Sequence, residues 1–119
     1  MSLLVNAYTR GDGGEMVILE PKDHSEELAG FEVFRKTFYG GQSARSLGLR
    51  LLPVLADADL YVEGPDLDAL QSEAEVVLQN IDHFVDEAGA EAETLRFRVQ
   101  NIVNATVRAR TANGGVVVW

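Results

Sequence analysis

Hydrophobic residues recur along this chain with helical spacing in some segments and alternating spacing in others. The clearest stripe lies in residues 67–88, where apolar positions fall about 100° apart around a helix axis. These positions are Leu67, Leu70, Ala74, Val77, Leu78, Ile81, Val85 and Ala88. Asp66 precedes the stripe as a suitable N-cap, and Gly89 follows it where a C-cap glycine belongs. The pattern predicts one uninterrupted helix over residues 67–88.

Two further helices are predicted earlier in the chain. Either Asp23 or Ser25 can cap the first of them. Its apolar positions are Leu28, Phe31, Phe34 and Phe38. The glycine pair 40–41 ends this helix, and a short second helix is expected over about residues 43–48.

The apolar residues in 95–112 fit both the period of a strand and the period of a helix. At their start, apolar residues alternate with polar ones, which is typical of a strand. The positions Leu95, Val99, Ile102, Thr106 and Ala109 follow helical spacing over the longer span. Length favours a helix, because strands are usually much shorter than this segment.

Short apolar runs predict the strands. Residues 3–9 and 16–19 flank a glycine-rich turn, which indicates a β-hairpin. Further strands are predicted near 59–63 and 116–119, and Trp119 at the end of the second is expected to anchor in the core. The sequence therefore predicts an α+β fold, in which a small sheet is packed by about three to four helices.

Length and composition place limits on this fold. The 119 residues suffice for a single compact domain, residues 1–119, with its own hydrophobic core. The chain has no cysteine, which excludes disulfides and thiolate metal sites and favours a reducing, cytoplasmic setting. No apolar run reaches 18 residues, so no transmembrane helix is predicted.

Charge is distributed unevenly along the chain. Residues 51–95 contain twelve Asp and Glu and no Lys or Arg, a charge of −12, whereas the rest of the chain carries +3 and the whole carries −9. We call residues 51–95 the acidic block. Such a surface repels nucleic acids and anionic membranes. It suits a basic protein partner.

Four acidic residues of this block share one flank of the predicted helix beside its apolar stripe. They are Asp68, Glu75, Asp82 and Asp86, which we call the carboxylate rail. No Lys follows any of them at i+4 to pair with it. The rail is either a binding surface, with Tyr61 and Val76 as apolar anchors, or a solvated flank. A further alternative is neutralisation by the arginines of the following segment: Arg96, Arg98, Arg108 and Arg110.

The predicted start of the short helix offers a second candidate site. Gly40 and Gly41 precede Ser43, and free N–H groups there can hold an anion with help from Arg45. The segment lacks the Walker lysine and the spaced Rossmann glycines. A simple joint between two helices explains the same residues.

Catalytic and metal motifs are absent from the sequence. Neither His24 nor His83 is spaced to frame a metal with another His or a Glu, so no catalytic residue, metal ligand or cofactor is expected. The acidic run that begins at Asp57 fails the EF-hand pattern, because Tyr61 and Val62 occupy its fifth and sixth positions. A looser divalent-cation site remains an alternative there.

A small, acidic, cysteine-free α+β chain resembles bacterial immunity and antitoxin-type proteins, in composition and not through a motif. The likeness implies a protein-binding module that inhibits a basic partner. The alternative is a small-ligand-binding or enzymatic domain with its anion site at residues 40–45. The sequence sets no oligomeric state.

Overall fold

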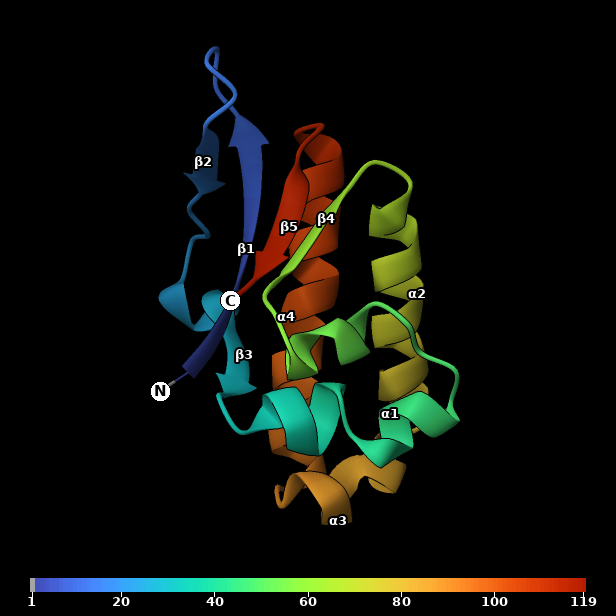
Figure 1. Cartoon of the computed structure of the whole chain (residues 1–119). Helices are drawn as coiled ribbons and strands as arrows, with labels where there is room; N and C mark the ends of the chain where they lie inside the picture. The colour runs from blue at the N-terminus through green and yellow to red at the C-terminus, as the bar shows by residue number, and fades with distance from the viewer. Residues whose placement is uncertain (1) are drawn as a thin grey trace.

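The computed structural model describes residues 2–119 and contains a five-stranded antiparallel sheet (Figure 1). The strands are β1 (Ser2–Arg10), β2 (Met16–Leu19), β3 (Leu28–Phe31), β4 (Leu60–Glu63) and β5 (Gly115–Val118). Four of them lie in the order β2-β1-β5-β4, and β3 pairs with the first residues of β1. The predicted hairpin and the two later strands are thus confirmed.

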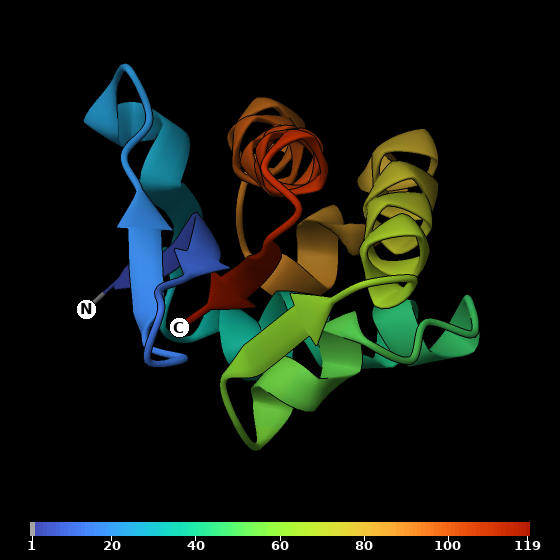
Figure 2. The same cartoon turned by 90° about the horizontal axis from the view of Figure 1, so that it is seen from above.

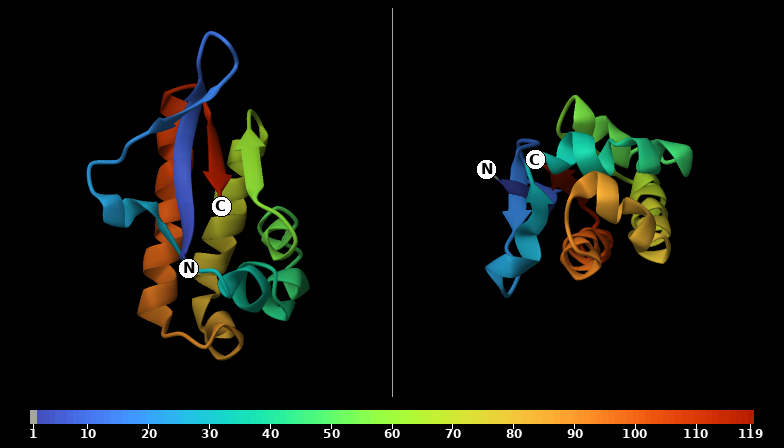
Figure 3. Two further views of the ribbon diagram at one scale, coloured as in Figure 1. Left: turned by 60° about the vertical axis from the view of Figure 1, so that its left-hand side comes forward. Right: turned by 90° about the horizontal axis from the view of Figure 1, so that it is seen from below.

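Helices cover one face and one end of this sheet. The long helices α2 (Asp66–Gln79) and α4 (Ala92–Thr111) lie side by side on one face (Figure 2). The short helices gather mainly at the end of the molecule opposite the β1–β2 turn (Figures 1 and 3). They are η1 (His24–Glu27), η2 (Arg35–Tyr39), α1 (Gln42–Ser46), η3 (Leu52–Ala56), η4 (Ile81–Phe84) and α3 (Val85–Ala88). The α+β prediction is confirmed.

The core lies between the sheet and the two long helices. Alternate strand residues face α2 and α4, so that Val5 pairs with Val118 and Ala7 with Val116, all fully buried. The ambiguous segment 95–112 is helical, as its length predicted. Among residues 2–119, no helix is both long and apolar enough to cross a membrane.

The prediction of one helix over residues 67–88 is wrong, because the helix breaks at Asn80. The Asn80 side-chain Nδ2 donates to the Val76 carbonyl at 2.8 Å, and its backbone leaves the helical region (φ −121°, ψ 26°). Asn competes for backbone acceptors in this way and so favours helix ends. After the break, Phe84 of η4 packs edge-on against Phe38 of η2, with ring centroids 5.2 Å apart.

The helix predicted from Asp23 to Phe38 is also wrong. Asp23 does cap a helix, accepting from the Ser25 N–H at 2.9 Å, but that helix is the single turn η1. The chain then pairs with β1 as β3, where Gly30 has a φ of 135° that a side chain rarely tolerates. Strand pairing with the distant N-terminus overrides the local helical period.

Candidate functional site

The acidic block divides into acids that have partners within the fold and acids that do not. Three of the first group form ion pairs with arginines from elsewhere in the chain. Asp59 lies 2.6 Å from Arg35, Asp68 lies 2.8 Å from Arg110, and Glu63 lies 3.3 Å from Arg10. Asp59, one of the acids considered for a divalent cation, is therefore paired with a cation of the protein itself.

Glu73 of α2 binds backbone N–H groups instead of a cation. Its carboxylate accepts from the N–H groups of Arg50, Leu51 and Leu52 at 2.9 to 3.1 Å. These groups begin η3 and have no partner within that helix. Glu73 thus caps η3 from a neighbouring element.

Glu87 of α3 caps α1 in the same way. Its two carboxylate oxygens accept from the N–H groups of Gln42 at 2.7 Å and Ser43 at 2.9 Å. The Ser43 hydrogen bond, followed by that of Gln42, lowers the pKa of Glu87 below its usual value. Gly41 leaves space for this contact, because a Cβ there would lie 2.7 Å from the carboxyl group.

This arrangement bears on the predicted anion site at Gly40, Gly41, Ser43 and Arg45. The helix start does hold an anionic group, but that group is Glu87 of the same chain. Arg45 points its Nε to the Gly40 carbonyl at 3.2 Å. A free anion at this helix start would have to displace Glu87.

Seven acids of the block have exposed side chains whose carboxylates have no hydrogen-bond or ion-pair partner among residues 2–119. They are Asp57, Asp66, Glu75, Asp82, Asp86, Glu91 and Glu93. Three members of the carboxylate rail belong to this set, and Asp68 does not. Because the helix breaks at Asn80, the rail is spread over α2, η4 and α3 instead of one helix. Of the four arginines on α4, only Arg110 forms an ion pair with an acid among residues 2–119.

A shallow hollow opens at the C-terminus of α3. It has a volume of about 340 Å³ and is lined by Val85, Asp86, Gly89, Ala90 and Glu91. Gly89 adopts a left-handed conformation (φ 66°) and ends α3, as the sequence predicted. The hollow combines apolar side chains with two free carboxylates, which suits the stem and the charged head of a Lys or Arg side chain.

The two predicted apolar anchors differ in their exposure. Tyr61 is 54% exposed on β4, on the side of the sheet that faces away from α2 and α4. Val76 is partly buried and packs against the core. Phe97 of α4, which the sequence did not single out as an anchor, is 45% exposed.

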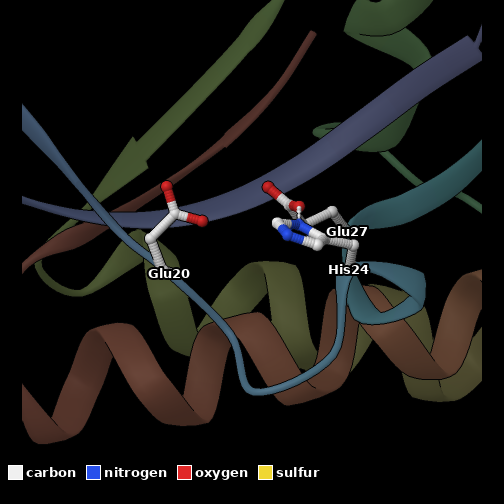
Figure 4. Close-up of side chains that lie close together, drawn as sticks. All are labelled: Glu20, His24 and Glu27. Carbon is white, nitrogen blue, oxygen red and sulfur yellow. Dashed lines mark hydrogen bonds and ion pairs between the residues drawn. The ribbon is translucent and has the colours of Figure 1, made fainter.

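The sequence also missed a cluster of possible metal ligands. Glu20, His24 and Glu27 come together around η1, and Figure 4 shows the two carboxyl groups and the imidazole close to one another. The sequence spacing did not predict a metal frame, whereas in the structure His24 Nδ1 lies 2.8 Å from Glu27 Oε1. The i, i+3 spacing of these two residues was the available signal, whereas Glu20 reaches them only through the fold.

Comparison of the chain with protein-family models, with curated proteins and with solved structures finds no match. The charges, exposures and contacts described above are therefore the basis for proposing a function.

Proposed function

We propose that the protein is a protein-binding module, of the immunity or antitoxin type, that presents an acidic surface to a basic partner. The acidic surface consists of the seven exposed acids without a partner in the described chain, above all Glu75, Asp82 and Asp86. Their lack of internal partners is the observation that carries the proposal. They remain available to cations of another molecule.

Self-neutralisation accounts for only part of the block. Arg110 of α4 pairs with Asp68, but Arg96, Arg98 and Arg108 of the same helix lie within ion-pair distance of no acid among residues 2–119. Uncompensated like charges in one region oppose folding. A surface that keeps them is better suited to attracting a partner of opposite charge, which speeds encounter and enforces the choice of partner.

The hollow at the end of α3 gives this surface a place for a specific contact. A basic side chain of the partner would lie along Val85 and Ala90 and reach Asp86 and Glu91 with its charged group.

Composition supports the setting that we propose for this binding. The net charge of −9 disfavours nucleic acid and anionic membranes as partners. A chain without cysteine suits a reducing compartment, and we place the module in the cytoplasm.

An affinity pull-down from the native host tests the proposal. The wild-type protein should capture a strongly basic protein at low salt and release it at high salt. The variant Glu75→Gln with Asp82→Asn should lose this capture. The matched control Asp12→Asn with Glu15→Gln changes the net charge equally on the β1–β2 turn and should retain it. Equal capture by both variants, or capture that resists salt, would refute the acidic surface as the binding site.

A further inference from the structure

Three side chains that commonly bind metals meet at η1, on elements that contribute nothing to the acidic surface. The carboxylate oxygens of Glu20 and Glu27 and a ring nitrogen of His24 all lie within 4.8 Å of one another (Figure 4). We propose that these residues form a binding site for a divalent transition-metal ion of the Zn²⁺ type.

The distances within the cluster fit such an ion. Two ligand atoms bound to one Zn²⁺ at about 2.1 Å stand about 3.0 to 3.4 Å apart in octahedral or tetrahedral geometry. His24 Nδ1 and Glu27 Oε1, at 2.8 Å, are already near this separation. Glu20, whose carboxylate lies within 4.8 Å of both, completes the set by a rotation of its exposed side chain.

A chain of hydrogen bonds through the buried Asn6 fixes one oxygen of the Glu27 carboxylate. Asn6 is only 3% exposed, and its Nδ2 donates to Glu27 Oε2 at 2.6 Å. The indole Nε1 of Trp119 in turn donates to Asn6 Oδ1 at 3.0 Å. Metal ligands are typically oriented by outer partners of this kind. The second Glu27 oxygen, Oε1, is left facing His24.

Electrostatics at the cluster favour a cation. Two carboxylates and one imidazole give the cluster a net negative charge even when His24 is protonated. Glu20 is exposed and has no hydrogen-bond partner among residues 2–119, although it lies beside the Glu27 carboxylate. The His24–Glu27 ion pair accounts for two of the three residues, whereas a bound cation also accounts for Glu20.

The ligand set also determines the class of metal ion. An imidazole nitrogen with two carboxylates suits Zn²⁺ and its neighbours in the first transition row, whereas Ca²⁺ and Mg²⁺ prefer oxygen ligands alone. His24 and Glu20 are both exposed to solvent, so water can complete the coordination sphere. Such a site keeps positions open to solvent.

Calorimetric titration of the whole chain with Zn²⁺ at neutral pH tests the site, because the protein has only two histidines. We expect one equivalent of Zn²⁺ to bind the wild type, and Ca²⁺ to bind at least about tenfold more weakly. His24→Ala and Glu20→Gln should each weaken Zn²⁺ binding at least about tenfold. His83→Ala removes the other exposed histidine, in η4, and should leave binding unchanged.

Several outcomes would overturn the proposal. They are an absence of Zn²⁺ binding to the wild type, binding that survives both His24→Ala and Glu20→Gln, and binding that is lost in His83→Ala. Equal affinities for Ca²⁺ and Zn²⁺ would also contradict it. The His24 side chain is 87% exposed, so its removal should leave the metal-free thermal midpoint unchanged and the titration interpretable.

Discussion

Replacing Glu73 should destabilise the protein, whereas replacing Glu75, two residues along the same helix, should not. Glu73 accepts three backbone N–H groups at the start of η3, and Glu75 has no partner within residues 2–119. The two variants therefore compare an acid that stabilises the fold with one that we assign to binding. Alanine at each position removes the same carboxylate from α2.

The contacts of Glu73 set the size of the effect. In Glu73→Ala the N–H of Arg50 can turn to water because that residue is exposed, but Leu51 is half-buried and Leu52 is fully buried. Each buried donor left without an acceptor costs about 1–3 kcal/mol, so two of them cost about 2–6 kcal/mol. For a domain of this size that lowers the thermal midpoint by about 8–24 °C. Glu75→Ala should remain within about 0.5 kcal/mol of the wild type.

Urea unfolding followed by circular dichroism measures both variants against the wild type. We expect the midpoint concentration to fall in Glu73→Ala with an unchanged slope, and to hold in Glu75→Ala. Equal midpoints for the two variants would refute the division of the acidic block into structural and free acids. So would a larger loss in Glu75→Ala.

Three further predictions concern stability. Glu87→Gln should cost about 1 kcal/mol at neutral pH, as the loss of a helix cap does. Because folding lowers the pKa of Glu87, its contribution is present above about pH 4.3 and lost as pH falls through the folded pKa, so acid titration of the variant should lack this step. Gly30→Ala should lower the free energy of unfolding, measured in urea, by about 2–4 kcal/mol, because φ is 135° and a Cβ would overlap the Phe34 ring. The control Gly48→Ala, in open space at φ 79°, should lower it by only about 1 kcal/mol. Raising salt from 0.01 to 0.1 M shortens the screening length from about 30 to about 10 Å and should raise the thermal midpoint by screening the free acids; a fall would mean that ion pairs dominate.

The sequence predicted elements whose local pattern agrees with their place in the fold. Helix α4 is long and periodic, β4 is bounded by Asp59 and Gly64, and β5 follows Asn113 and Gly114, so pattern and tertiary structure coincide. β3 could not be predicted, because its pairing partner is the N-terminus and its Leu28 and Phe31 form a helical spacing with the later Phe34 and Phe38. The break at Asn80 depends on a side-chain hydrogen bond to Val76, whereas the apolar stripe continues across it.

Contacts between distant segments of the chain also limited the prediction of the candidate site. The concentration of acids was visible in the sequence, but their division into paired and free groups was not. Glu73 and Glu87 have no local partner, and each binds backbone N–H groups 21 or more residues away. Glu20 is only four residues before His24, but the loop after β2 has no regular period from which their approach could be predicted. Contacts between distant segments are fixed by packing, which periodicity does not report.

The association rate with the captured partner tests the central claim most directly. At low salt, Glu75→Gln with Asp82→Asn should slow association about tenfold and change dissociation little, because exposed charges act on encounter. The control Asp12→Asn with Glu15→Gln removes the same charge from the β1–β2 turn and should associate at the wild-type rate. Equal slowing by both variants would mean that only net charge matters, and no slowing by either would mean that the free acids take no part in binding. Each of these results would contradict the account.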